Sequence, residues 1–372
     1  MRFRLFVFVL IVVLAAFSVS LFAQSTPQSD PTLDAHVAEA FVEASAAAKS
    51  SNHDQAAEIY WSIAERFPDH ADAPRAAKQA AYTTDKLGDR DKSIAAFKRA
   101  LDMYPDSGYA PALKRCLALS YQAKGEKERA IRELDDLISR YPKSDAACLG
   151  LINLGLLHIA QVCKQNTDEQ NWQRKEEADA AFRRVTETFP DKRDLCAKAE
   201  MYRVGIAFER VLAQRSTWDI AAEQIRNVLS TYADAPGAIK ARLEIMLAEI
   251  AMENGDYQDQ ARRADALIQA YPQCKLEIGW ASLIAGYGYE NTGDYATALK
   301  RYLLVIEGHY AVADNFKGLD VTLFCLMRSA ECHVRTGETA KALDIWQTVL
   351  KNYPSSPKAS LSAAMIAKYG GK

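Results

Sequence analysis

Small and large apolar residues recur along the chain in a pattern that predicts pairs of helices. Eight successive units share one position that is alanine in six of them. A large apolar residue usually follows four positions later, so the two side chains lie on one helix face. The alanines are Ala56, Ala130, Ala178, Ala221, Ala298 and Ala342, and Ser93 and Gln260 fill the other two units. The large residues are Tyr60, Phe97, Leu134, Phe182, Ile225, Tyr302 and Trp346.

Each unit is punctuated by a turn residue and a stop. An aromatic residue followed by proline closes six units, at Phe67-Pro68, Tyr104-Pro105, Tyr141-Pro142, Phe189-Pro190, Tyr271-Pro272 and Tyr353-Pro354, and Tyr232-Ala233 and Tyr310-Ala311 look like degenerate copies. Glycine stands seventeen residues before the proline at Gly88, Gly125, Gly255 and Gly337, and Gly293 stands eighteen residues before Ala311. A tight turn needs the backbone freedom of glycine, and proline cannot continue a helix. Each period is therefore predicted to form helix A, a turn and helix B, and to end at the aromatic–proline stop.

These positions resemble the tetratricopeptide repeat (TPR) family, whose turn motif is similar to Gly255-Asp256-Tyr257 and Gly293-Asp294-Tyr295. The resemblance covers about residues 34–372. It implies an all-α, right-handed α-solenoid of about eight TPR-like helix pairs, in one superhelical domain. The amphipathic segment from Ser360 to Lys368 is expected to form the C-terminal capping helix that the end of a solenoid requires.

The segments between repeats resemble those of bacterial envelope TPR proteins. Tyr104-Pro105-Asp106-Ser107, Tyr141-Pro142-Lys143-Ser144 and Tyr353-Pro354-Ser355-Ser356 carry this likeness. Examples are the TPR lipoprotein of the outer-membrane barrel-assembly machine and the coordinator associated with the Tol–Pal system. No cysteine precedes Cys116, so the usual lipid attachment site of a lipoprotein is absent.

Three units depart from the regular length. The fourth has an insertion of polar residues near 164–172, the fifth has a long helix A reaching about Gln214, and the eighth begins with a loop near 313–318. Insertions in a repeat array lie at turns and can contact partners. Trp172 favours that interpretation if its side chain is exposed, whereas a tryptophan folded under the loop would be structural.

The N-terminus predicts export. Arg2 and Arg4 precede an uncharged run over residues 5–23, which is typical of a secretory signal peptide. We expect a signal peptide at 1–23, a flexible linker at 24–33, and a periplasmic or secreted protein. Leu21 is large for the position three residues before cleavage, so the alternative is an uncleaved inner-membrane anchor formed by residues 5–23.

Composition excludes some classes of function. A formal net charge of −2 gives no general attraction to nucleic acid. The seven cysteines form no C-x-x-C pair, and they are interpreted as small buried residues or as disulfide partners that export would permit. The six histidines show no metal-ligand spacing, and phosphate loops and nucleophile elbows are absent. We therefore expect no enzyme activity, no cofactor and no metal site.

Binding is expected on the A helices, which line the concave face in the TPR architecture. Alignment to the turn residues places a basic set early in the chain and an aromatic set later. The candidate partner-binding residues are Arg75, Lys78, Tyr82, Arg115, Gln122, Arg242, Trp280 and Tyr287. Such a groove suits a protein or peptide with an acidic part and apolar anchors.

The leading hypothesis is an exported scaffold for protein–protein interaction, an adaptor or assembly factor in the bacterial cell envelope. The alternative is a recognition subunit for a cell-wall glycan or another non-protein envelope ligand. Glycan binding would depend on aromatic residues such as Trp280 and Tyr287, and little on Arg75 or Arg115.

Overall fold

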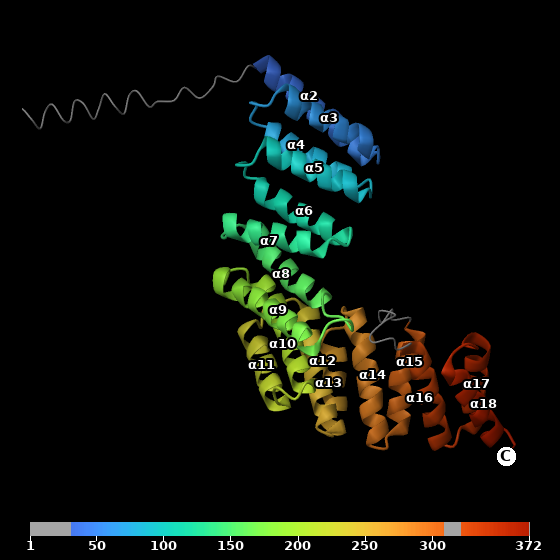
Figure 1. The fold of residues 1–372 in the computed structure, drawn as a ribbon. Coiled ribbons are helices and arrows are strands. Elements are labelled where there is room, and N and C mark those ends of the chain that lie inside the picture. The colour runs from blue at the N-terminus through green and yellow to red at the C-terminus, as the bar shows by residue number, and fades with distance from the viewer. Residues whose placement is uncertain (1–30, 309–320, 372) are drawn as a thin grey trace, which may run out of the picture. The chain divides into compact units, whose positions relative to one another are not determined.

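The computed structural model describes residues 31–308 and 321–371. They form 17 helices and no strand, in two compact units that meet in sequence between Tyr141 and Pro142. Successive helices pair as repeats 1 to 8, from α2/α3 to α16/α17, with α18 following the last pair (Figure 1). The predicted all-α fold of eight TPR-like pairs with a C-terminal helix is confirmed.

The N-terminal unit holds repeats 1 to 3. Its helices are α2 (Pro31–Lys49), α3 (His53–Arg66), α4 (Ala73–Asp85), α5 (Arg90–Met103), α6 (Ala110–Ala123) and α7 (Lys127–Arg140).

The C-terminal unit holds repeats 4 to 8 and the last helix. Its helices are α8 (Asp145–Ala160), α9 (Asp168–Thr188), α10 (Arg193–Leu212), α11 (Trp218–Thr231), α12 (Gly237–Glu253), α13 (Tyr257–Ala270), α14 (Lys275–Asn291), α15 (Tyr295–Glu307), α16 (Val321–Arg335), α17 (Thr339–Asn352) and α18 (Pro357–Tyr369).

The turns between paired helices are built as the glycine pattern predicts. Gly88, Gly125, Gly255, Gly293 and Gly337 all have φ between 75° and 88°. Side chains other than glycine rarely adopt this left-handed conformation. An aspartate follows three of these glycines and caps the next helix. The carboxylate of Asp294, for example, accepts a hydrogen bond from the Thr297 backbone N–H at 3.0 Å.

The aromatic residue before each proline ends helix B. Tyr104 has φ −136° and ψ 62°, outside the helical region, and proline favours such a change in the residue before it. Tyr232 adopts nearly the same angles before Ala233, so the repeat geometry imposes this stop even without proline. The tyrosine hydroxyls also link repeats: Tyr104 donates to the Ala64 carbonyl at 2.9 Å and Tyr141 donates to the Pro105 carbonyl at 3.1 Å.

The recurring small and large residues form the contact between paired helices. All six alanines of the pattern are fully buried, and so are Ser93 and Gln260. Burying the Gln260 amide is offset by a hydrogen bond that it donates to the Ile284 carbonyl at 3.0 Å. In repeat 4 the Phe182 ring fills the space beside Gly155, where an added Cβ would lie 2.5 Å from the ring. The helices can therefore approach closely only if one of the two residues is small.

Several boundaries differ from those that the sequence predicts. The first helix begins at Pro31, inside the segment expected as a linker (24–33), and α18 begins three residues before Ser360. The loop near 313–318 and the signal segment lie outside the described residues. Because the chain divides into two units, a single superhelical domain over 34–372 stays a prediction. No helix among residues 31–308 and 321–371 is long and apolar enough to cross a membrane.

Candidate functional site

The eight residues expected to bind a partner fall into two groups. Arg75, Lys78 and Tyr82 lie on α4, and Arg115 and Gln122 lie on α6, all in the N-terminal unit. Arg242 lies on α12, and Trp280 and Tyr287 lie on α14, all in the C-terminal unit. One groove lined by both groups therefore stays a prediction, and each group is described by itself.

Cations and aromatic rings alternate along the A helices of the N-terminal unit. The Arg75 guanidinium lies over the ring of Phe41 on α2, 4.7 Å from its centre, and the Lys78 ammonium lies 4.2 Å from the centre of the Tyr109 ring, just before α6. Such contacts are favourable because the face of an aromatic ring attracts a cation. They fix both cations at the surface. We call Arg75, Lys78 and Arg115, with the rings of Phe41 and Tyr109, the basic face.

The charges of the basic face are largely unmatched. Arg75 forms one ion pair, to Asp72 at 3.4 Å, whereas Lys78 and Arg115 form none within the described residues. Burial lowers the pKa of Lys78, and the charge of Arg75 lowers it further. A negative group bound here would reduce this repulsion, so the basic face is suited to an acidic partner.

Tyr82 and Gln122 have different surroundings. The Tyr82 ring packs edge-on against Phe97, with ring centres 5.9 Å apart, and its hydroxyl lies beside the Cys116 thiol. Burial raises the pKa of Tyr82 to about 12. Tyr82 thus contributes to packing between repeats as well as to the surface. Gln122 is exposed and makes no side-chain hydrogen bond to any residue that the structure describes.

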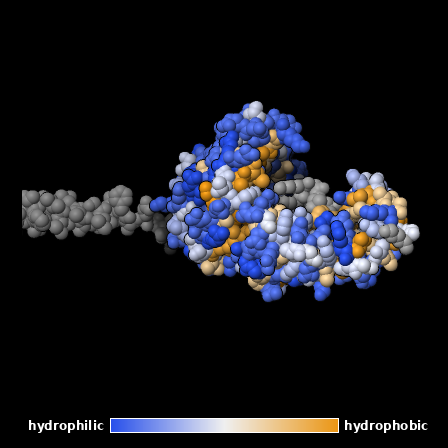
Figure 2. Space-filling model, turned by 90° about the horizontal axis from the view of Figure 1, so that it is seen from below, coloured by the Kyte–Doolittle hydropathy of each residue, from blue (hydrophilic) through white to orange (hydrophobic). Residues whose placement is uncertain are grey.

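The candidate residues of the C-terminal unit contact more neighbouring side chains than residues lining an open groove would. Arg242 pairs with the buried carboxylate of Glu277 on α14 at 2.9 Å. The Trp280 side chain is half-buried against the core around Tyr302, and Tyr287 packs edge-on against Tyr257 at 6.1 Å. On the face shown in Figure 2, hydrophobic residues form separate patches within a mainly hydrophilic surface. The aromatic rings here serve packing first.

Of the two alternatives for Trp172, the structure shows the buried one. Its side chain is buried, 8% exposed, in the first turns of α9. The ring is covered by two cations: the Lys175 ammonium lies 4.8 Å and the Arg215 guanidinium 4.6 Å from its centre. The polar insertion became an extension of α9, which starts with a capping box formed by Thr167 and Gln170. Trp172 therefore stabilises the fold and does not present itself to a partner.

Sequence reasoning missed a cleft in the C-terminal unit. It lies between α9 and α11 over α10, has a volume of about 480 Å³, and is lined by charged and amide side chains that include Asp179, Arg183, Arg203 and Asn227. These residues come from three different helices and fit solvated helix faces in the sequence. The one available signal was Asp179, next to Ala178, which occupies the buried small-residue position of repeat 4.

The cysteines do not pair within the described residues, and acidic and histidine side chains there do not gather into a ligand cluster. All seven cysteines are free, and five of them are buried. No group of three or more His, Cys, Asp or Glu side chains among the described residues could hold a metal ion. The buried thiols fit the interpretation of small core residues.

Comparison with protein families agrees with this architecture. Residues 324–356, from α16 to the stop of repeat 8, match the tetratricopeptide repeat model. The chain has the fold of a tetratricopeptide-repeat solenoid. Residues 74–246 also match a family described as YfiO, outer membrane lipoprotein. The resemblance inferred from the turn glycines and aromatic–proline stops is confirmed.

Solved structures show the same fold at low identity. The C-terminal part of a TPR repeat-containing protein from Cytophaga hutchinsonii has a TM-score of 0.50 at 13% identity, covering 78% of this chain and 98% of that one. A TPR protein from Parabacteroides merdae scores 0.45 at 15% identity, covering 79% and 98%. Pseudomonas aeruginosa PilF scores 0.47 at 14% identity, covering 68% and 96%. A search of curated proteins found no match.

Proposed function

We propose that this TPR protein is an exported adaptor or assembly factor that holds protein partners together in a bacterial cell envelope. The observation that carries the proposal is the match of residues 74–246 to the outer membrane lipoprotein family. The secretory pattern of residues 1–23 agrees with it.

The partner binds through the A helices of the N-terminal unit in this proposal. Lys78 and Arg115 are cations without an ion pair among the described residues, and Phe41 and Tyr109 offer apolar surface beside them. An acidic protein segment with apolar side chains would match both properties. Gln122 lies on the same helix as Arg115 and extends the surface.

Crosslinking in the native cells tests the proposal. A photoreactive amino acid at Gln122 should crosslink a defined envelope protein, identified by mass spectrometry, while one at the exposed Lys98 on helix B of repeat 2 should not. Cell fractionation and sequencing of the mature N-terminus would show whether the protein is exported and cleaved. Recovery of the protein only in the cytoplasm would refute the envelope role.

Substitution of the basic face tests which residues bind. The variant Arg75→Ala/Lys78→Ala/Arg115→Ala should bind the crosslinked partner at least tenfold more weakly, with unchanged helix content. Arg90→Ala, which removes a cation from the start of α5, is the matched control. Full binding by the triple variant would reject the basic face as the contact surface.

A further inference from the structure

The last helix, α18, is built in the register of a helix A. The alanine five residues after the stop proline is buried in α18 as it is in α6 and α8, at Ala359, Ala110 and Ala147. One face of α18 packs on repeat 8, where the Tyr369 ring stacks on Trp346 with ring centres 5.7 Å apart. α18 therefore lies against repeat 8 as the helix A of a further repeat would.

A second face of helix A contacts helix B of the same repeat. Lys114 on α6, nine residues after the stop proline, pairs with Glu133 on α7 at 3.1 Å. Gly155 on α8, thirteen residues after its stop proline, lies against the Phe182 ring on α9. Positions nine and thirteen are four residues apart and share one helix face. The residue at position thirteen is buried in repeats 2, 3 and 4, at Ala81, Ala118 and Gly155.

The same face is open on α18. Ala363 and Ala367 stand nine and thirteen residues after Pro354, and both are exposed, so no helix among residues 31–308 and 321–371 covers them. Ala364 beside them is exposed too. The last helix of a solenoid usually presents polar side chains on its outer face, whereas these three side chains are apolar. We call Ala363, Ala364 and Ala367 the open face of α18.

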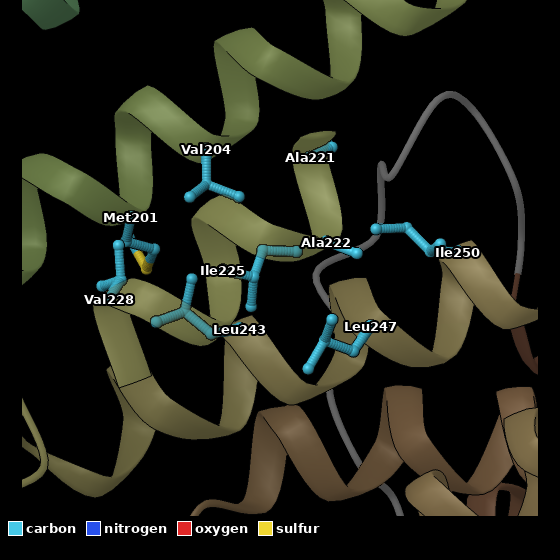
Figure 3. Close-up of a cluster of buried hydrophobic side chains, with 9 residues drawn as sticks. All are labelled: Met201, Val204, Ala221, Ala222, Ile225, Val228, Leu243, Leu247 and Ile250. Atoms are coloured by element: carbon cyan, nitrogen blue, oxygen red, sulfur yellow. The ribbon is translucent and has the colours of Figure 1, made fainter. Parts of the chain in front are cut away.

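The complete repeats show what covers such a face. A helix B lies between its own helix A and the next one: Ile225 of α11 belongs to one buried cluster with Val204 of α10 and Leu243 of α12 (Figure 3). Helix A supplies a small residue opposite a large residue of helix B, as Gly155 does for Phe182. An amphipathic helix with a large apolar residue at that position would therefore fit the alanines of α18.

A lysine beside the open face favours an acidic helix. Glu65, three residues before the stop proline of repeat 1, pairs with Arg99 on the next helix B. Lys351 holds the same position in repeat 8, is exposed, and forms no ion pair within the described residues. α18 itself carries two lysines and no acidic residue. A helix bound here would place its equivalent of Arg99 near Lys351, where an acidic side chain would be attracted.

We propose that the open face of α18 is a second docking surface, which binds an amphipathic helix of a partner protein in the position of a further helix B. The bound helix packs a large apolar residue against Ala363 and Ala367 and places an acidic residue beside Lys351. This surface is separate from the basic face of the N-terminal unit. It rests on the proposed function only in that the occupant is part of a protein.

A peptide with the sequence of α7, Lys127–Arg140, is the probe. It is a helix B whose large residue is Leu134, and Asp136 stands six residues before its stop proline, as Arg99 does in repeat 2. A hydrocarbon staple on the polar face would hold the helix, because isolated helices of this length are marginal in water. Fluorescence anisotropy of the labelled peptide with the full chain should show saturable binding.

Variants of the full chain test where and how the peptide binds. Ala367→Glu, which puts a charged side chain on the open face, should weaken binding at least tenfold. Ala266→Glu, at an exposed alanine of α13, is the matched control and should change binding less than twofold. Lys351→Glu should weaken binding about fivefold, and a peptide with Asp136→Lys should restore it. Circular dichroism should show the same helix content for all variants.

Other outcomes reject the docking surface. Absence of binding, equal effects of Ala367→Glu and Ala266→Glu, or a loss in Lys351→Glu that the reversed peptide does not restore would each overturn it. Self-association of the free chain that Ala367→Glu abolishes would identify a second copy as the occupant and reject the partner helix. If the variant lacking Arg75, Lys78 and Arg115 loses the peptide and Ala367→Glu keeps it, the open face is rejected and the proposed function stands.

Discussion

Repeats 2 and 3 differ from repeats 4 and 5 in the lengths of their helices and in the residues at their turns. In α4 to α7 every helix has 13 or 14 residues, and the turns use Gly88 and Gly125 at positive φ. In α8 to α11 two helices reach 21 and 20 residues, and a glutamine, Gln214, takes the left-handed conformation. Longer helices there are tied by ion pairs between α9 and α10, such as Lys175–Glu209 at 3.2 Å.

The small and large core positions are the same in both regions. Ala178 and Phe182 in repeat 4 are as fully buried as Ser93 and Phe97 in repeat 2. Core residues therefore set the geometry of each helix pair, while turn length is free to vary when other contacts replace the short turn. In repeats 4 and 5 these other contacts are the ion pairs of Asp179 with Arg183 and Arg203 and the cations that cover the Trp172 ring.

Removing the buried charge should have the largest effect. Asp179→Asn removes the buried carboxylate that pairs with Arg203, which keeps only Glu200 at 2.8 Å, and breaking a buried pair costs about 3–5 kcal/mol. Asp136→Asn in repeat 3 should cost less than about 1 kcal/mol, because Lys114 keeps Glu133 at 3.1 Å. Urea unfolding followed by circular dichroism would compare the two. Equal losses would show that the regular and irregular repeats depend on charge to the same degree.

The same substitution predicts a pH dependence. The pKa of Asp179 is lowered in the folded protein, so its stabilisation is present above the unfolded pKa of about 3.9 and is lost as pH falls through the folded value. The stability difference between the native protein and Asp179→Asn should therefore shrink between pH 5 and pH 2, by about 1.4 kcal/mol for each unit of pKa shift. A constant difference would contradict this role.

Trp172→Ala should rank next. Removing a buried tryptophan costs about 3 kcal/mol, and it also uncovers Lys175 and Arg215. Trp61→Ala is the control in the N-terminal unit, where the half-buried ring carries Arg99 on one face, and it should cost about 1 kcal/mol. Hydrogen exchange should show the loss first in the N-terminal turns of α9. Similar losses of unfolding free energy for the two variants would indicate that Trp172 stabilises the fold no more than a half-buried tryptophan does.

Substitutions of two glycines inside helices test how closely the helices of repeats 4 and 5 are packed. Gly155→Ala forces a Cβ against the Phe182 ring and should destabilise by about 1–3 kcal/mol despite the higher helix propensity of alanine. Gly205→Ala on α10 meets no atom within 4 Å and should stabilise by up to about 1 kcal/mol. Thermal unfolding of the two variants should shift in opposite directions. A shift of Gly155→Ala to higher temperature would show that α8 and α9 can move apart.

The turn residues should give the smallest changes, again with opposite signs. Gly88→Ala places a side chain at φ 81° and should cost about 1 kcal/mol, whereas Gln214→Gly relieves φ 58° and should gain less than about 1 kcal/mol. Chemical denaturation at high precision would measure both. A loss from Gln214→Gly would mean that its side chain stabilises the longer turn.

Sequence alone predicted the repeats because their signals are local. A turn glycine, a small residue five positions later and an aromatic stop all lie within one helix pair, so spacing was enough to place Gly337, Ala342 and Tyr353. The boundary at Pro357 was missed because proline is favoured in the first turn of a helix, while the prediction treated it only as a stop.

The sites were harder to predict because they depend on helices far apart in sequence. Asp179 and Arg203 meet across 24 positions, and Arg210 and Glu176 across 34, so their contact depends on how α9 lies on α10. Arg75 and Lys78 lie beside aromatic rings, and their place on a concave binding face stays a prediction. Whether Trp172 would be exposed or covered stayed open, because periodicity does not show which residues of an insertion are buried when it continues a helix.

The bonds from Tyr104 and Tyr141 to the preceding repeat have a consequence for how such a chain can grow. In the segment Tyr104-Pro105 the tyrosine hydroxyl donates backward to the Ala64 carbonyl, and the proline carbonyl accepts from Tyr141. This segment thus carries both halves of the link. A tandem copy of the unit that ends in this segment would bring a donor for its predecessor and an acceptor for its successor, so lengthening the array there needs no new partner at the junction.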